Sequence, residues 1–250
     1  MRYITPLREG GSLPAIAEAD DGFMYVLKFR GAGQGVKALI AEFLGGEIAR
    51  CLGLKVPELV FATLDEGFGR AEPDEEIQDL LKASKGLNIG FHYLSGALTY
   101  DPALHSLDAE TASRIVWLDA LITNVDRTAR NTNMLMWNRE LWLIDHGAAF
   151  YFHHNLQDWR AQATRPFERI KDHVLLGSAT RIHETDAVCR TLITPGRIRH
   201  WVEALPDVWL QEYEGYTVAQ VREIYEQFLS ERVAHSEIFT NQIDVARKTL

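Results

Sequence analysis

Two short apolar runs separated by a polar break constrain the fold of this chain more than any other feature. The chain is apolar-rich over residues 133–137 and apolar again over residues 141–144, with three polar residues between the runs. Runs of this length around a short polar turn are typical of a β-hairpin. Folding the chain back at this turn would bring Asn131 and Asp145 close together at the open end of the hairpin.

Three polar side chains surround the expected hairpin. Asp126 lies on a loop after an expected helix at 108–123, Asn131 follows five residues later, and Asp145 follows the second apolar run. Loops held by rigid elements are where catalytic residues concentrate, and the side-chain oxygens of Asn131 and Asp145 suit a hard cation such as Mg²⁺. In phosphoryl transfer, one Asp handles the proton of the acceptor, while an Asn and an Asp hold magnesium on the ATP phosphates. The pattern therefore favours a phosphoryl-transfer site over a surface loop with solvated charges.

The chain changes character near residue 96. The part before this point has strand patterns, one helix pattern and an acidic connector: strands at 9–17, 23–29, 59–64 and 87–94, a helix at 37–52, and the connector at 65–86. The part after it has mostly helix patterns, at 108–123, 155–162, 164–174, 183–191, 195–203 and 217–248. We therefore predict an α+β fold of two lobes, a β-rich lobe over 1–95 and a mainly helical lobe over 96–250. A cleft between two lobes is a common ligand site.

Composition limits the classes of partner. The chain of 250 residues has a net charge of −9, which argues against non-specific binding to nucleic acid or to an anionic membrane. No run approaches the roughly 18 apolar residues that span a bilayer, and the N-terminus lacks the apolar stretch of a signal peptide. Cys51 and Cys189 lie far apart and form no metal-binding pattern, which favours a reducing compartment. We expect a cytoplasmic protein.

A lysine and a glutamate in the first lobe fit the same kind of site. Lys28 ends the apolar strand pattern, and a lysine that points inward there needs an anion, whereas an outward-facing lysine does not. A phosphate-binding lysine of this type pairs with a glutamate on a neighbouring helix. Glu42 is the first choice because it lies beside apolar helix positions that face the sheet, and Glu47 is the alternative.

Two further groups are candidates for phosphate contacts. Gly10-Gly11-Ser12 lies at an expected strand turn, and glycines let backbone N–H groups approach an anion, although any hairpin can contain Gly-Gly. Arg127 and Arg130 flank the loop of Asp126. Either arginine can neutralise phosphate charge or orient Asp126.

The order of these segments resembles that of the HipA-like kinases, bacterial members of a protein-kinase-like group that is also similar to the phosphatidylinositol kinases. The resemblance covers roughly residues 9 to 150. The matching segments are Gly10-Gly11-Ser12, Val26-Leu27-Lys28, the helix from Ala41-Glu42-Phe43 through Leu52-Gly53-Leu54, Asn124-Val125-Asp126-Arg127-x3-Asn131, and Ile144-Asp145-His146-Gly147. Two features differ: Thr128 stands where the family has His, and from the length of 250 residues we expect a protein without the extra N-terminal domain of the full-length toxin kinases.

The resemblance implies ATP and Mg²⁺ as cofactors and a Ser or Thr of a protein as the acceptor. It assigns the base to Asp126 and the metal to Asn131 and Asp145. It also assigns the phosphates to Lys28, with Glu42 as the partner of that lysine. The differences make the chain similar to the compact stand-alone branch of the family.

Two other functions stay open from the sequence. One is a small-molecule or lipid kinase, although the acidic composition argues mildly against a lipid acceptor at a membrane. The other is a nucleotide-binding pseudokinase that acts as a module for an unknown protein partner. Against the pseudokinase, the chain retains the lysine, the base and both metal ligands that the resemblance assigns.

Overall fold

The N-terminal lobe is built on one antiparallel sheet. The computed structural model describes residues 1–7, 13–70 and 72–250. In this part of the chain, five strands pair in the order β1-β2-β3-β5-β4. The strands are β1 (Arg2–Pro6), β2 (Ala15–Glu18), β3 (Met24–Lys28), β4 (Leu59–Leu64) and β5 (Gly86–His92). The strands expected at 23–29, 59–64 and 87–94 are confirmed, whereas β1 was not expected.

Helix α1 (Val36–Cys51) joins the sheet to the second lobe. It matches the expected helix at 37–52, but its burial is not confined to one face, because the consecutive residues 39–46 are all buried. Gly53, with φ +73°, follows the helix in the left-handed conformation that commonly ends helices. The buried residues of α1 share one apolar core with helices of the second lobe. The helix is therefore held from both sides.

The acidic segment at 65–86 was expected to be a connector, and this prediction was wrong. The segment contains helix α2 (Glu75–Ala83), which begins at Asp74, whose side chain accepts a hydrogen bond from the N–H of Glu76. Ile77 and Leu81 bury the apolar side of α2 in the core of the sheet. The acidic residues of the first turn favour a helix here, because they lie at the positive end of the helix dipole.

The predicted hairpin is confirmed. Strands β7 (Met134–Trp137) and β8 (Glu140–Leu143) pair antiparallel, and β6 (Leu98–Thr99) adds a third strand beside β7. Asn138 and Arg139 form the turn with φ of +50° and +64°. Positive φ at both turn residues matches the right-handed twist of the flanking strands.

Helices make up most of the remaining chain. The α-helices are α3 (Ala109–Ile122), α4 (Trp159–Ala163), α5 (Ile182–Leu192), α6 (Pro195–Glu203), α7 (Asp207–Leu210), α8 (Val218–Ala234) and α9 (Glu237–Arg247). The short 3₁₀ helices are η1 (Tyr151–His154), η2 (Leu156–Asp158), η3 (Glu168–Asp172) and η4 (Leu176–Ser178).

Three helix predictions need correction. The helix expected at 164–174 is only the 3₁₀ helix η3, and the helix expected at 155–162 is a 3₁₀ turn followed by the short α4. The single helix expected at 217–248 is two helices, α8 and α9, with a break at His235 and Ser236. The break lets α9 pack against α3 and α5, and periodicity alone does not reveal such a turn.

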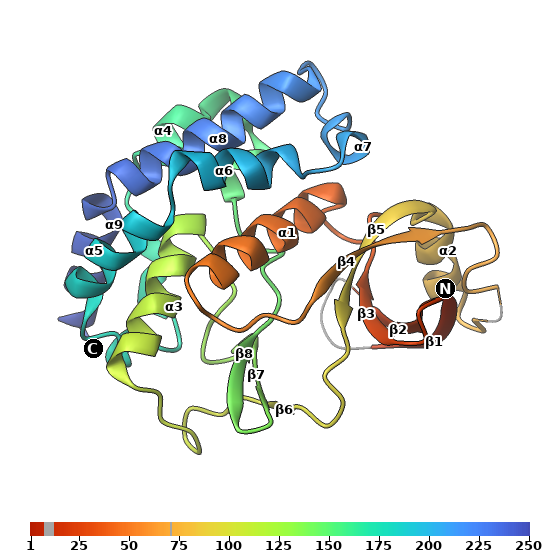
Figure 1. Ribbon diagram of the computed structural model, residues 1–250, viewed down its shortest axis with the longest axis horizontal. Coiled ribbons are helices and arrows are strands. Elements are labelled where there is room, and N and C mark those ends of the chain that lie inside the picture. The colour runs from red at the N-terminus through yellow and green to blue at the C-terminus, as the bar shows by residue number, and fades with distance from the viewer. Residues whose placement is uncertain (8–12, 71) are drawn as a thin grey trace.

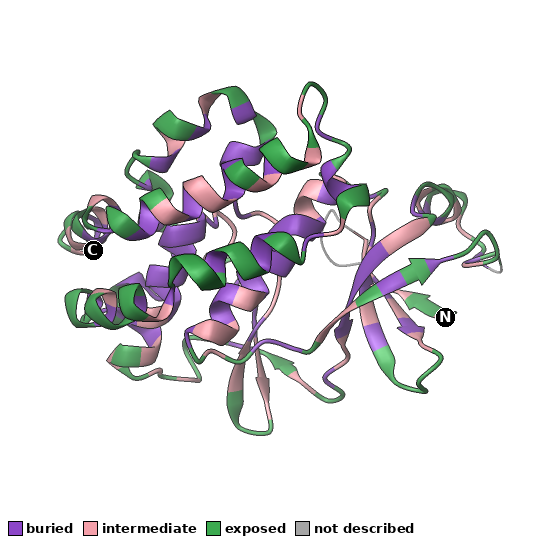
Figure 2. Cartoon of the chain, turned by 45° about the horizontal axis from the view of Figure 1, so that its top comes forward, coloured by how far each residue is buried: buried purple, intermediate pink, exposed green. Residues whose placement is uncertain are grey.

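The elements form the two-lobed α+β fold that the sequence predicts. Figure 1 shows the sheet of β1–β5 on one side, the helices α3–α9 on the other, and α1 between them. Buried residues concentrate on the facing sides of α1 and the helices of the second lobe (Figure 2). The predicted lobe boundary at residue 95 lies between β5 and β6. Within the described ranges, no helix is long and apolar enough to cross a membrane.

One buried histidine gives the fold an expected sensitivity to acid. His153 is fully buried, and its Nδ1 lies 2.9 Å from the hydroxyl of Tyr225, while Nε2 has no hydrogen-bond partner among the described residues. Burial, together with the nearby His154 and Lys37, lowers the pKa of His153 well below its ordinary value. The unfolded chain takes up this proton below about pH 6.5 and the native protein does not, so stability falls as the pH falls.

We therefore expect His153→Gln to make the free energy of unfolding depend less on pH below pH 7. Glutamine stays neutral and retains a polar atom for Tyr225. The loss in unfolding free energy between pH 7 and pH 5, measured by urea denaturation, should shrink by up to about 2 kcal/mol. An unchanged loss in the variant would contradict this origin of the acid sensitivity.

Candidate active site

Lys28 lies at the junction of the two lobes, at the end of β3. Its ammonium contacts the carboxylate of Glu42 on α1 and lies 2.6 Å from Oδ1 of Asp145, which follows β8. Glu47, the alternative partner, pairs instead with Arg50 on its own helix. The structure thus brings together three residues that the sequence singled out from three separate segments.

Burial and charge set the protonation of this cluster. Burial disfavours the charged form of Lys28, but the carboxylates of Glu42 and Asp145 raise its pKa above the ordinary value. Burial raises the pKa of Glu42 to about 7, against the opposing charge of Lys28. Burial also acts on Asp145, but the Lys28 ammonium lowers the pKa of that carboxyl to about 2. At neutral pH, Lys28 is therefore a cation and Asp145 an anion.

The segment after Asp145 packs tightly on α1. The N–H of His146 donates to Oε2 of Glu42 at 2.9 Å. A Cβ added at Gly147 would lie 3.1 Å from Oε1 of Glu42, and one added at Gly45 would lie 2.7 Å from Cβ of His146. Both glycines therefore permit this close approach, which fixes Asp145 relative to Glu42.

His146 is enclosed in this packing. Its side chain is fully buried, and neither ring nitrogen has a hydrogen-bond partner among the residues that the structure describes. Burial, reinforced by the charge of Arg127, lowers the pKa of His146 to about 3. The imidazole is therefore neutral at neutral pH and adds no charge beside Asp145.

Asp126 is held by asparagines on both sides of its loop. Its backbone N–H donates to the side-chain oxygen of Asn124 at 3.1 Å. Its Oδ2 accepts from the amide nitrogens of Asn131 at 2.8 Å and Asn133 at 3.2 Å. These contacts orient the carboxylate and leave its Oδ1 without a hydrogen bond from the described chain.

The buried carboxylate of Asp119 supports the loop of Asp126 through hydrogen bonds. Asp119 on α3 is fully buried and accepts from Asn124 at 2.9 Å, from Nε of Arg127 at 2.6 Å and from Nε2 of His173 at 2.9 Å. Nδ1 of His173 accepts the N–H of Leu175, so the hydrogen on Nε2 points at Asp119. Burial opposes the charge of Asp119, but Arg127 and His173 hold its pKa well below the ordinary value.

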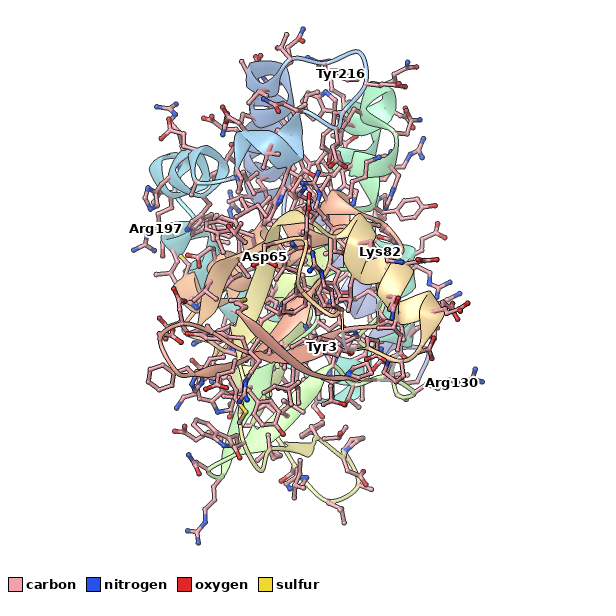
Figure 3. The ribbon with its side chains drawn as sticks, turned by 90° about the vertical axis from the view of Figure 1, so that its right-hand side faces the viewer. Tyr3, Asp65, Lys82, Arg130, Arg197 and Tyr216 are labelled. Atoms are coloured by element: carbon pink, nitrogen blue, oxygen red, sulfur yellow. The ribbon has the colours of Figure 1, made fainter. Side chains whose placement is uncertain are left out.

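Arg127 occupies a different position from the one expected for a phosphate contact. Its side chain is buried, and besides Asp119 it donates to the carbonyl of Asn133 and, at 3.4 Å, to that of Ile144. The N–H of Ile144 in turn donates to the carbonyl of Asn133 at 3.0 Å. Arg127 thus links the loop of Asp126 to Ile144, the residue before Asp145. This position is compatible with orienting Asp126 and not with neutralising phosphate charge. Arg130 is exposed and extends away from the molecule (Figure 3).

The residues present suit a magnesium ion that also takes ligands from a nucleotide. Asn131 uses its amide nitrogen as a donor to Asp126, so its side-chain oxygen stays available. Asp145 contacts Lys28 through Oδ1 and keeps its second oxygen. Within the described ranges, no three His, Cys, Asp or Glu side chains form a metal cluster. Magnesium bound by one or two side chains plus substrate phosphates is common in enzymes that use ATP.

Some site residues lie beyond what the motifs revealed. Asn133, Asp119 and His173 complete the support of Asp126, and of these Asp119 carries a sequence signal. Asp119 interrupts an apolar helix, where a buried acid needs partners, whereas the left-handed conformation of Asn133, with φ +48°, is visible only in the structure. The expected phosphate loop Gly10-Gly11-Ser12 lies outside the described residues.

Comparison with known proteins shows the family and the fold of the chain. No curated protein matches the chain. The crystal structure of the Helicobacter pylori proinflammatory kinase CtkA is similar in fold, with a TM-score of 0.54 over 100% of this chain and 98% of that one, at 13% sequence identity. The family model for HipA-like kinases matches residues 1–239. The chain therefore belongs to the family of HipA-like kinases.

Proposed function

We propose that this kinase uses ATP and Mg²⁺ to phosphorylate a Ser or Thr hydroxyl of a protein. The observation that carries the proposal is the junction at Lys28, where one ammonium is held between Glu42 and Asp145. The loop of Asp126 is tied to the same hairpin through Asn133. A lysine–glutamate pair beside a metal-binding Asp and a catalytic-loop Asp is the arrangement that phosphoryl transfer in kinases requires.

Each residue has a separate role in this proposal. Lys28 stabilises negative charge on the phosphates, and Glu42 holds the ammonium in place. Asn131 and Asp145 hold magnesium, which neutralises charge on the phosphates when it is bound. Asp126 accepts the proton of the acceptor hydroxyl through the carboxylate oxygen that no asparagine occupies. Arg127 acts through Asp126 and is a positioning residue.

Nucleotide binding is the first test. Millimolar ATP should raise the melting temperature of the wild-type protein in the presence of Mg²⁺, because a ligand that binds only the native state stabilises it by mass action. Asp145→Asn should lose the magnesium-dependent part of the rise, since it removes a charged metal ligand. The shift is compared within each variant, because Asp145→Asn also removes a partner of Lys28.

Asp79→Asn is a matched control for this test, since Asp79 is an exposed acid on α2. It should retain the full shift. A wild-type protein that ATP and Mg²⁺ do not stabilise would contradict the proposal, and so would a full shift in Asp145→Asn.

The acceptor class needs a second measurement. We expect radiolabel from γ-labelled ATP to appear on Ser or Thr of protein or peptide acceptors. The support for a protein acceptor is the family similarity together with the exposure of Asn131 beside the base, which leaves this side of the loop open. Label found only on small hydroxyl compounds would identify a small-molecule kinase instead.

A further inference from the structure

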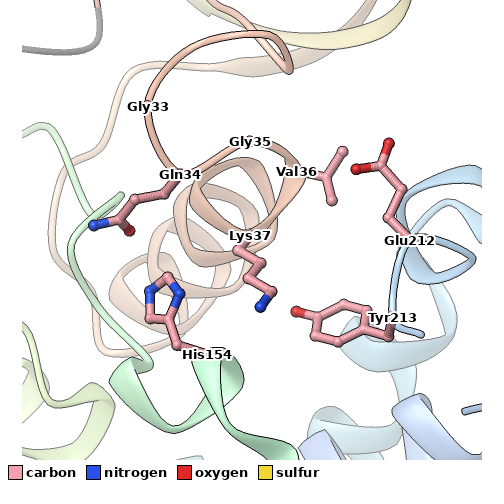
Figure 4. Close-up of a pocket in the computed structure, with 8 residues that line it drawn as sticks. All are labelled: Gly33, Gln34, Gly35, Val36, Lys37, His154, Glu212 and Tyr213. Atoms are coloured by element: carbon pink, nitrogen blue, oxygen red, sulfur yellow. The ribbon is translucent and has the colours of Figure 1, made fainter. Parts of the chain in front are cut away.

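A pocket of about 360 Å³ lies at the start of α1, and neither Asp145 nor Asp126 is among its lining residues. It is formed by the loop before α1, by η1, and by the residues that follow α7. Figure 4 shows its lining: Gly33, Gln34, Gly35, Val36, Lys37, His154, Glu212 and Tyr213. The proposed function assigns no role to any of these side chains.

The ammonium of Lys37 makes this pocket suitable for an anion. Burial lowers the pKa of its ammonium, and no other group contributes to the shift. In the described part of the chain, no carboxylate lies within ion-pair distance of Lys37, and its one recorded partner is the ring of Tyr213, 5.2 Å from Nζ. In a protein with 35 acidic and 26 basic residues, an unpaired and partly desolvated cation inside a pocket is a position for an external anion.

His154 and Tyr213 add hydrogen-bonding groups beside this cation. Figure 4 shows the Lys37 ammonium between the imidazole of His154 and the hydroxyl of Tyr213. Burial, followed by the charge of Lys37, lowers the pKa of His154, so its ring carries one N–H at neutral pH. The hydroxyl of Tyr213 lies 2.8 Å from that of Tyr225, which fixes the position of the phenol at the pocket wall.

The backbone and the remaining charge are compatible with an anion. Gly35 precedes α1 with φ +63° and provides no capping side chain, so N–H groups of the first helical turn stay available. The one acid in the lining, Glu212, pairs with the guanidinium of Arg30. Figure 4 shows Glu212 beside Val36 and away from His154, so the paired acid leaves the Lys37 side of the pocket positive.

We propose that this pocket binds the phosphate group of a small phosphate monoester, at a site separate from the nucleotide site. A tetrahedral dianion offers acceptor oxygens in several directions, which matches donors that converge from α1, η1 and the segment after α7. The pocket volume exceeds that of inorganic phosphate and leaves room for a small organic group. The binding part of this proposal does not rest on the proposed kinase activity.

Isothermal titration calorimetry with inorganic phosphate and with glycerol 3-phosphate tests the site, at constant ionic strength set with chloride. We expect both ligands to bind the wild-type protein, the monoester more tightly. Lys37→Gln should weaken binding about tenfold or more, because it removes a charge-assisted hydrogen bond. Lys82→Gln is the matched control, since Lys82 is an exposed lysine on α2 that does not line the pocket (Figure 3), and it should leave the affinity unchanged.

A third titration separates this pocket from the active site. Phosphate should still bind when the nucleotide site is saturated with Mg²⁺ and a non-hydrolysable ATP analogue. Loss of phosphate binding in that sample, equal affinity in Lys37→Gln, or no binding by the wild type at millimolar phosphate would overturn the proposal. If the analogue fails to bind while phosphate binding depends on Lys37, the kinase proposal fails and the second site stands.

Discussion

Replacement of Asp126 by Asn is expected to lower kcat by roughly 10²–10⁴-fold, the usual contribution of a positioned general acid or base. The carboxylate of Asp126 is oriented by Asn131 and Asn133, and an amide at this position cannot accept the proton of the acceptor hydroxyl. The affinity for ATP should change little, because Lys28 and Asp145 remain. Steady-state transfer of labelled phosphate, measured with an acceptor found in the labelling experiment, gives both quantities.

The asparagine variant is chosen because it preserves the shape of the loop. Its side-chain oxygen can still accept from Asn131 and Asn133, so the melting temperature should stay close to that of the wild type. Asp79→Asn again serves as the control, with unchanged kcat. Undiminished phosphate transfer by Asp126→Asn would show that Asp126 is not the base.

The sequence predicted those parts of the site that short local patterns encode. The hairpin follows from two apolar runs around a polar turn, and it places Asp145 at a defined end. The pairing of Lys28 with Glu42 follows from a strand residue and a helix residue only 14 positions apart. Such contacts leave a signal in spacing, because each element is recognisable by itself.

Contacts between distant segments left much less signal. His173 meets Asp119 across 54 positions, and its segment was expected to be a helix, whereas it lies in an isolated bridge with Thr128. The pocket at the start of α1 combines Lys37, His154 and Tyr213 from three segments that share no motif. These contacts arise from tertiary packing, and the spacing of residues along the sequence does not predict which distant segments meet.

Replacement of Arg127 by Met is expected to destabilise the protein by roughly 3–5 kcal/mol, the usual cost of removing one partner of a buried ion pair. Asp119 would remain fully buried and charged, with only Asn124 and His173 to donate to it. The carbonyl of Asn133 would also lose its donor from Arg127. Urea denaturation at pH 7 measures the change, and a loss below about 1 kcal/mol would contradict the assigned pairing.

The double variant Arg127→Met/Asp119→Asn distinguishes the ion pair from lost packing. If the cost arises from the uncompensated charge of Asp119, adding Asp119→Asn should recover part of the stability, so the two losses should not add.

Arg127→Lys keeps the charge but cannot reach Asp119 and both hairpin carbonyls with one planar group. We expect this variant to fold, to bind nucleotide, and to lower kcat more than KM for ATP, because the loop of Asp126 loses its tie to the segment before Asp145. A wild-type kcat in Arg127→Lys would restrict Arg127 to a purely structural role.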